Sequence, residues 1–98
     1  HGKVLLVEMT LAEDSPVVGK VVGEVNLPRD TSLVAIVRAG HVIAPRDETP
    51  LMVGDEVLAL ATAETMGELE LVLSGTLTRG SESSEEFAED YSATERSS

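Results

Sequence analysis

Few residues of this chain could take part in acid–base or nucleophilic chemistry. His41 is the best-placed candidate for a general base, because it follows Gly40 at the turn of a predicted hairpin. The chain has no cysteine, and no serine stands in a nucleophile elbow that His41 could activate. A histidine at the edge of a strand is more often structural than catalytic. The sequence therefore predicts no catalytic residue and a protein that is not an enzyme.

Three pairs of adjacent carboxylates are the other candidates for chemistry: Glu13-Asp14, Asp47-Glu48 and Asp55-Glu56. Hard cations such as Ca²⁺ favour clustered carboxylates, but these pairs do not have the spacing of an EF-hand loop. Adjacent acids in the turns of an acidic protein are usually solvated surface. We therefore expect no metal ligands.

The charge of the chain excludes one class of partner. Residues 1–79 contain 12 acidic and 6 basic side chains, and residues 80–98 contain 6 and 1, which gives the net charge of −11. Binding of DNA or RNA depends on a basic surface that neutralises phosphates, and the basic residues here are dispersed. A nucleic-acid polymer is excluded as a partner, whereas a small nucleotide held by one or two local cations is not.

The apolar residues predict a small aliphatic core. The only aromatic residues, Phe87 and Tyr91, lie in the polar C-terminal stretch, which leaves a folding unit of about eighty residues. A unit of this size buries only about 60–65% of the surface of its unfolded chain, so its stability margin is thin. Without cysteine it can form no disulfide, and a partner subunit is the expected supplement.

The N-terminal half reads as a strand followed by a helix. Residues 3–11 alternate apolar and polar side chains after an apolar start, which is typical of a strand. Ser15-Pro16 supplies an N-cap hydroxyl and a proline at the first helical position. The valines from Val17 to Val25 recur at helical spacing, Gly19 and Gly23 are spaced for close packing of that helix, and Pro28 ends it.

The second half reads as three strands and a helix. Residues 33–37 and 42–44 form a predicted hairpin around Gly40, and Gly54-Asp55 leads into a strand over 56–61. Thr62 is the expected cap of a second helix, with Met66, Leu69 and Leu73 on its apolar face and Gly75 at its C-terminus. The fold class is α+β in the order β-α-β-β-β-α, with two helices on one face of a mixed four-stranded sheet.

Composition divides the chain into three parts. Residues 1–2 read as a tag remnant or linker, residues 3–75 as one domain, and residues 76–98 as an acidic, Ser- and Glu-rich disordered tail. No apolar run approaches the roughly 18–20 residues that span a bilayer. We find no signal peptide and expect a soluble chain.

Read in order, several cap and turn residues form a recognisable set. SPVVGKVVGEVNLP is followed by SLVAIVRAGHVIAPRDETPLMVGDEVLALATAETM. These segments resemble the TrkA C-terminal domain, or RCK-C, the regulatory module of bacterial and archaeal potassium channels and transporters. The resemblance covers about residues 3–73, and its most specific elements are Ser15-Pro16, Gly19-Lys20, the strand leading to Arg38 and Gly40, Pro45, Leu51 and Gly54-Asp55.

The resemblance implies a non-catalytic sensor that regulates potassium transport. It implies a homodimer attached to an upstream RCK-N domain or to a channel or transporter membrane subunit, at the cytoplasmic face of the cell membrane. Some family members bind cyclic di-AMP in a cleft between the two domains of the dimer, so the expected effector is cyclic di-AMP or another nucleotide, with no other cofactor.

By position in the family, the wall of that cleft would involve Val22, Leu27, Ser32, Leu33 and Pro45. The aliphatic side chains among them would pack against the adenines, and Arg29 or Arg46 is the nearest cation for a phosphate. The sequence departs from the family's ligand-binding pattern at Pro28, where an arginine can stand, and at Ser32, where an asparagine can stand. The alternative is a structural dimerisation module in which the same residues form dimer core and bind no small molecule.

Overall fold

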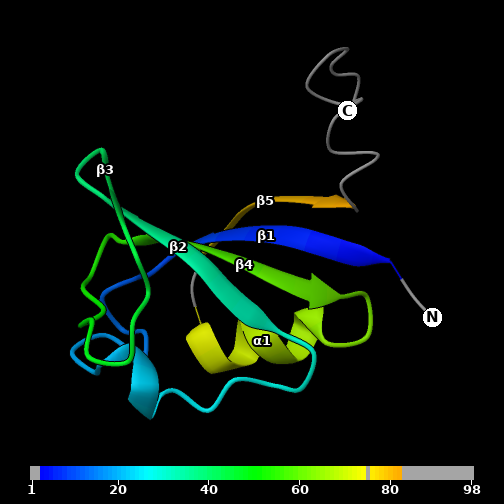
Figure 1. Cartoon of the computed structure of the whole chain (residues 1–98), viewed down its shortest axis with the longest axis horizontal. Helices are drawn as coiled ribbons and strands as arrows, with labels where there is room; N and C mark the ends of the chain where they lie inside the picture. The colour runs from blue at the N-terminus through cyan, green and yellow to red at the C-terminus, as the bar shows by residue number, and fades with distance from the viewer. Residues whose placement is uncertain (1–2, 75, 83–98) are drawn as a thin grey trace.

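The computed structural model describes residues 3–74 and the backbone of residues 76–82. Five strands, one α-helix and one 3-10 turn make up this part of the chain (Figure 1). In chain order they are β1 (Val4–Thr10), the 3-10 turn η1 (Val22–Glu24), β2 (Ser32–Arg38), β3 (His41–Ile43), β4 (Glu56–Thr62), α1 (Met66–Leu73) and β5 (Thr76–Glu82). The α+β class predicted from the sequence is confirmed.

The strands form one antiparallel sheet in the order β3-β2-β4-β1-β5. The prediction of a mixed, four-stranded sheet is therefore wrong in two respects. A parallel pair needs a long crossover, usually a helix. Here β4 lies between β1 and β2, so the two strands that the expected helix would have joined are not neighbours.

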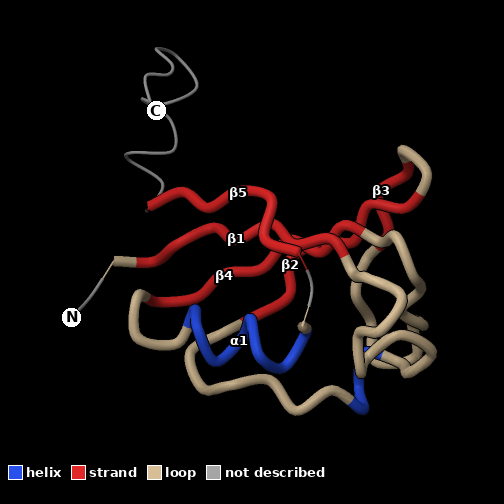
Figure 2. Tube along the Cα trace, turned by 180° about the vertical axis from the view of Figure 1, so that it is seen from behind, coloured by secondary structure: helices blue, strands red, loops and turns tan. Residues whose placement is uncertain are grey.

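The core lies on the face of the sheet that α1 covers (Figure 2). In β1 and β4 every second side chain points to this face, and there Val7, Met9, Val57 and Ala59 are fully buried. From the helix, Leu69 and Leu73 complete the layer, as their spacing predicts. Within residues 3–74, no helix lies over the other face of the sheet.

The segment expected to be the first helix is a series of turns that ends in η1. Gly19 has a φ of +91°, which is incompatible with a continuing right-handed helix. The backbone N–H groups of Gly19, Val22 and Gly23 donate to carbonyls of residues 47–51 instead of to the preceding turn. A second segment of chain therefore replaces the helical hydrogen bonds, and the valines that suggested a helix pack as loop residues.

The helix α1 begins one turn later than its predicted cap. Thr62 and Thr65 form a local hydrogen-bonded turn, in which the Thr62 N–H donates to Thr65 Oγ1 at 3.0 Å. Thr65 then stands at the N-cap position, and Ser74, in the left-handed region at φ 46°, ends the helix. The expected C-cap Gly75 lies outside the described residues.

The predicted tail begins within the sheet. Residues 76–82 form β5 and pair with β1 over Leu5–Thr10, so these seven residues are part of a strand and not of a disordered tail. The remainder, residues 83–98, lies outside the described part of the chain, as do residues 1–2. No helix within residues 3–74 has the length and hydrophobicity needed to span a bilayer.

Ser15 joins the turn segment to the end of α1. Its buried hydroxyl donates to the Leu73 carbonyl at 2.6 Å and accepts the Val17 N–H at 3.3 Å. The capping role predicted for Ser15 is therefore present, although no α-helix follows. The same hydroxyl also satisfies one of the carbonyls that the last turn of α1 leaves without a helical partner.

We predict that Ser15→Ala lowers the free energy of unfolding by about 1–2 kcal/mol, because the buried Leu73 carbonyl loses its donor. Urea denaturation followed by circular dichroism measures the change. Ser32→Ala, at an exposed serine, is the matched control and should leave the unfolding midpoint unchanged. Equal destabilisation by both changes would contradict a specific role for the Ser15 hydroxyl.

Candidate functional site

Two loops far apart in the sequence lie side by side at one end of the sheet. The N–H of Gly19 donates to the Leu51 carbonyl and the N–H of Leu51 to the Lys20 carbonyl, both at 2.8 Å. The N–H of Val22 donates to the Thr49 carbonyl at 2.9 Å. A Cβ added at Gly23 would stand 3.1 Å from the Asp47 carbonyl oxygen, so this glycine permits the close approach.

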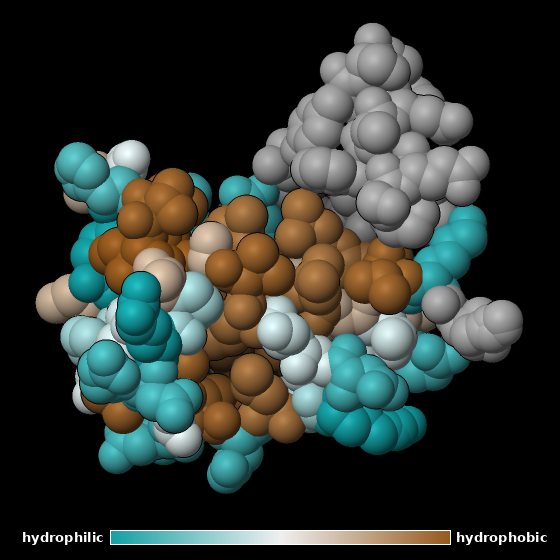
Figure 3. Space-filling view, in the orientation of Figure 1, coloured by the Kyte–Doolittle hydropathy of each residue, from teal (hydrophilic) through white to brown (hydrophobic). Residues whose placement is uncertain are grey.

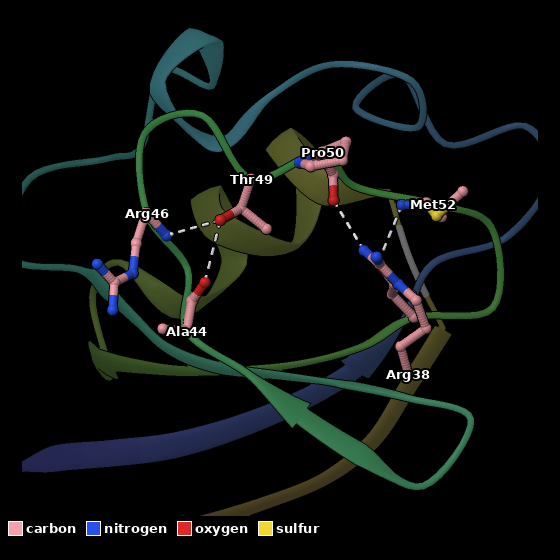
Figure 4. A network of polar contacts seen from close by, with 7 residues as sticks. Arg38, Ala44, Arg46, Thr49, Pro50 and Met52 are labelled. Atoms are coloured by element: carbon pink, nitrogen blue, oxygen red, sulfur yellow. Dashed lines mark hydrogen bonds and ion pairs between the residues drawn. The ribbon is translucent and has the colours of Figure 1, made fainter.

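Pro45 and Arg46 belong to the second of these loops. Thr49 closes the turn: its hydroxyl accepts the Arg46 N–H and donates to the Ala44 carbonyl, both at 3.1 Å (Figure 4). The Arg46 side chain extends away from this turn and is exposed. The loop therefore presents a cation on a backbone that hydrogen bonds hold in place.

The remaining predicted site residues lie on the connection into β2. Arg29 is exposed in a turn, Ser32 is the first residue of β2 and is also exposed, and Leu27 and Leu33 are half-buried against the core. Ser32 lines an open depression of about 400 Å³ together with Val4, Asp30, Thr31, Leu60 and Thr62. Sequence reasoning missed the other five residues, although the alternation of β1 and β4 places Val4, Leu60 and Thr62 on the face away from the core.

The structure thus divides the predicted ligand site into two groups. Val22, Pro45 and Arg46 lie on the two paired loops. Arg29 lies in the turn that follows Leu27 in the sequence, and Ser32 is the first residue of β2. Val22 is already buried in the core of the single chain. Within one chain, therefore, Ser32 opens onto the depression, and Arg46 extends from a different loop.

Arg38 and Asp55 form a bidentate ion pair beneath the second loop. Arg38 Nε and Nη2 donate to the two carboxylate oxygens of Asp55, each at 2.8 Å. The same Nη2 donates to the Pro50 carbonyl at 2.8 Å, and Asp55 accepts the Met52 N–H at 2.9 Å (Figure 4). The pair therefore joins the end of β2, the loop and the entry to β4.

The pair changes the titration of both groups. Burial of Asp55, whose side chain is 1% exposed, opposes its ionisation. The hydrogen bonds from Arg38 and from the Met52 amide, with the attraction of the guanidinium charge, outweigh burial and hold the pKa of Asp55 below its ordinary value. The hydrogen bond to Asp55 raises the pKa of Arg38. Asp55 is therefore a fixed anion at neutral pH.

The other candidates for chemistry are dispersed. His41 is exposed and stands opposite Arg38 in the β2-β3 hairpin, whose turn residues Ala39 and Gly40 both have positive φ. Asp55 is engaged by Arg38, while Glu13 and Asp14 are exposed. Across residues 3–74, His, Asp and Glu side chains do not gather in threes as a metal ion requires.

Comparison with known proteins shows which family has these turn and cap residues. The family model for the TrkA-C domain matches residues 6–74. The chain belongs to the TrkA-C domain family. Its residues 15–55 carry the family resemblance, and in the structure their glycines, Ser15, Arg38 and Asp55 shape turns, tie α1 to the turn segment and fasten the second loop. The resemblance predicted from the sequence is confirmed.

Two curated relatives are potassium uptake proteins. The Trk system potassium uptake protein TrkA of Mycobacterium tuberculosis is 44% identical over 72 residues, which are 74% of this chain and 33% of that protein. A TrkA homologue of Archaeoglobus fulgidus is 32% identical over 78 residues, which are 80% of this chain and 18% of that protein. The chain thus spans about a third or less of the length of these relatives.

A solved structure described as an RCK domain with "cda" has the same fold. It superposes with a TM-score of 0.61 at 24% identity and covers 69% of this chain and 96% of the solved one. At this identity the likeness shows the fold alone. TrkA-C domains are regulatory and non-catalytic, so membership of the family confirms the prediction that this chain is not an enzyme.

We predict that Asp55→Asn lowers the free energy of unfolding at pH 7 by about 2–3 kcal/mol, because charge-assisted hydrogen bonds to a buried carboxylate are lost. The folded-state pKa of Asp55 lies below the unfolded value of about 3.9, so the contribution of the carboxylate is present above about pH 4. It is lost as the pH falls through the folded-state pKa.

Urea unfolding at a series of pH values from 7 to 2 tests this prediction. The difference in unfolding free energy between the wild type and Asp55→Asn should be constant above about pH 5 and should shrink below about pH 4. Glu56→Gln, at the adjacent exposed carboxylate, is the matched control. A difference that stays constant down to pH 2 would show that the charge of Asp55 does not stabilise the fold.

Proposed function

We propose that this domain is the sensory part of a potassium transport regulator and acts without catalysis. The observation that carries the proposal is the family match over residues 6–74, together with 44% identity to a protein named for potassium uptake. Two copies form a homodimer attached to an RCK-N domain or to a membrane subunit, at the cytoplasmic face of the membrane. Ligand binding changes the relative position of the two domains, which biases the transporter between two states.

The proposed ligand is cyclic di-AMP, and the basis for this choice is the resemblance of the sequence to family members that bind it. A two-fold symmetric dimer presents two copies of every residue, which matches a ligand with two adenines and two phosphates. Arg29 and Arg46 are exposed in this chain and are the cations closest in sequence to the proposed cleft wall. Each can reach a phosphate without leaving a buried partner unpaired.

The apolar wall has a second use, which favours a competing function. Val22, Leu27 and Leu33 already pack in or against the core of the single chain, and only part of their surface is free for another molecule. The exposed part of these three side chains is enough to contribute to a dimer interface, which needs no ligand cleft. The alternative is therefore a dimerisation module that binds no small molecule.

Titration calorimetry with cyclic di-AMP, with ATP and AMP as the comparison nucleotides, distinguishes the two functions. We expect one cyclic di-AMP to bind per dimer and to raise stability by about 2.7 kcal/mol at 100 times the dissociation constant. Arg29→Gln or Arg46→Gln should weaken binding about tenfold or more, because a charge-assisted contact to phosphate is lost. Lys20→Gln, at an exposed lysine outside the proposed cleft, should bind as the wild type does.

Sedimentation equilibrium on the same samples tests dimerisation separately. A dimer without heat of binding from any nucleotide would support the module that has no ligand. A monomer at all concentrations, with and without cyclic di-AMP, would contradict both functions.

A further inference from the structure

The face of the sheet away from α1 carries exposed aliphatic side chains. Val4 is 46% exposed and Leu60 is 38% exposed, and Leu6 and Leu58 lie on the same face by strand alternation. Hydrophobic residues gather across the middle of the molecule where β1, β2 and β4 lie (Figure 3). We call Val4, Leu6, Leu58 and Leu60 the outer face. Contiguous apolar surface of this kind usually has a binding partner.

The outer face is hollowed at one end. The depression of about 400 Å³ has Val4 and Leu60 as its apolar lining and Asp30, Thr31, Ser32 and Thr62 as its polar rim. Val4 is opposite Thr62 in the β1-β4 register, and Leu60 is opposite Ser32 in the β2-β4 register, so the depression crosses three strands. An apolar floor with a polar rim suits one amphipathic side chain, such as an aromatic ring.

The last described strand ends beside this depression. Glu82, the final residue of β5, is opposite Leu5 of β1, which adjoins Val4. The chain continues for another 16 residues, and these contain Phe87 and Tyr91, the only two aromatic residues of the protein. The described domain therefore has an aliphatic depression and no ring to fill it, and both rings of the chain lie in the segment that starts next to it.

We propose that residues 83–98 dock on the outer face of their own chain, with Tyr91 in the depression. Phe87 is the fifth residue after Glu82, and an extended chain of five steps reaches about 17 Å; Tyr91 has a longer reach. Leu60 lies two strands from β5, a distance of about 10 Å. Either ring can therefore reach the depression without displacing β5.

Apolar contact has to hold this segment, because charge opposes it. Residues 83–98 contain five acidic side chains and one basic, and residues 1–82 contain thirteen acidic and six basic. Two negatively charged parts of one chain repel each other, and salt screens that repulsion. Docking therefore strengthens as salt is added. An aromatic ring that leaves water favours the docked state by about tenfold.

Tyr91 is the only tyrosine of the chain and there is no tryptophan, so tyrosine fluorescence reports directly on this segment. Acrylamide, a neutral quencher, measures its exposure in the full chain. We expect the quenching constant in buffer to be several-fold lower than in the urea-unfolded chain, and to fall further at high salt. A native quenching constant equal to the unfolded one, or one that rises with salt, would overturn the proposal.

Two substitutions locate the docking surface. Leu60→Asp, on the outer face, should raise the quenching constant of Tyr91 to the unfolded value. Leu71→Asp is the matched control, because Leu71 is 78% exposed on α1, which covers the opposite face. It should leave the quenching constant unchanged. Circular dichroism establishes that both variants are folded, and Leu60→Ser replaces Leu60→Asp if the charged variant unfolds.

Dilution distinguishes docking of residues 83–98 on their own chain from docking of a second copy of the chain. Docking within one chain gives a quenching constant that does not change across a hundredfold dilution, in the wild type and in the Phe87→Ser variant alike. Protection of Tyr91 that disappears on dilution would assign the outer face to another molecule and would overturn the proposal. Equal exposure of Tyr91 in Leu60→Asp and Leu71→Asp would overturn it as well.

Discussion

The ion pair of Arg38 and Asp55 is the constraint on which the loop end of this domain depends. Its four hydrogen bonds join Arg38 at the end of β2, Asp55 at the entry to β4, and the loop between them at the Pro50 carbonyl and the Met52 amide. A carboxylate as buried as that of Asp55 is tolerated only where its lone pairs are satisfied. The second loop in turn supplies the carbonyls that replace helical bonds in the valine-rich segment. The buried charge therefore fastens the second loop, and that loop holds the valine-rich segment through backbone hydrogen bonds.

How much of this could be predicted from sequence depends on where the hydrogen bonds of each segment lie. β1, β2, β4 and α1 bond within regular elements, so their periodicity is enough to identify them and to place Leu69 and Leu73 in the core. Backbone groups of residues 15–25 form hydrogen bonds to a loop about thirty residues away, and no local sequence pattern indicates such bonds. The glycine at position 19, which the structure places at positive φ, was the available signal, but a glycine in a run of valines at helical spacing equally suggests close packing.

The candidate site was less predictable than the fold, for a related reason. Family position gave five residues and proximity in the sequence added two arginines; the structure places these seven on two loops and a strand start, with the apolar members partly used by the core. Val4, Leu60 and Thr62 became candidates only once the sheet register brought them beside Ser32. Tertiary packing decides whether a residue faces solvent, the core or a second subunit. Alternation in the sequence shows which residues of a strand share a face, but it does not show what that face contacts.

The contact between the two loops has a consequence for how this domain can change over time. The bonds from Gly19, Val22, Gly23 and Leu51 join backbone to backbone, and they require small size only at Gly23. The side chains of Pro45 and Arg46 take no part in these bonds. Mutations there can alter which molecule is recognised while the frame persists. Related domains can therefore come to recognise different ligands without first losing stability.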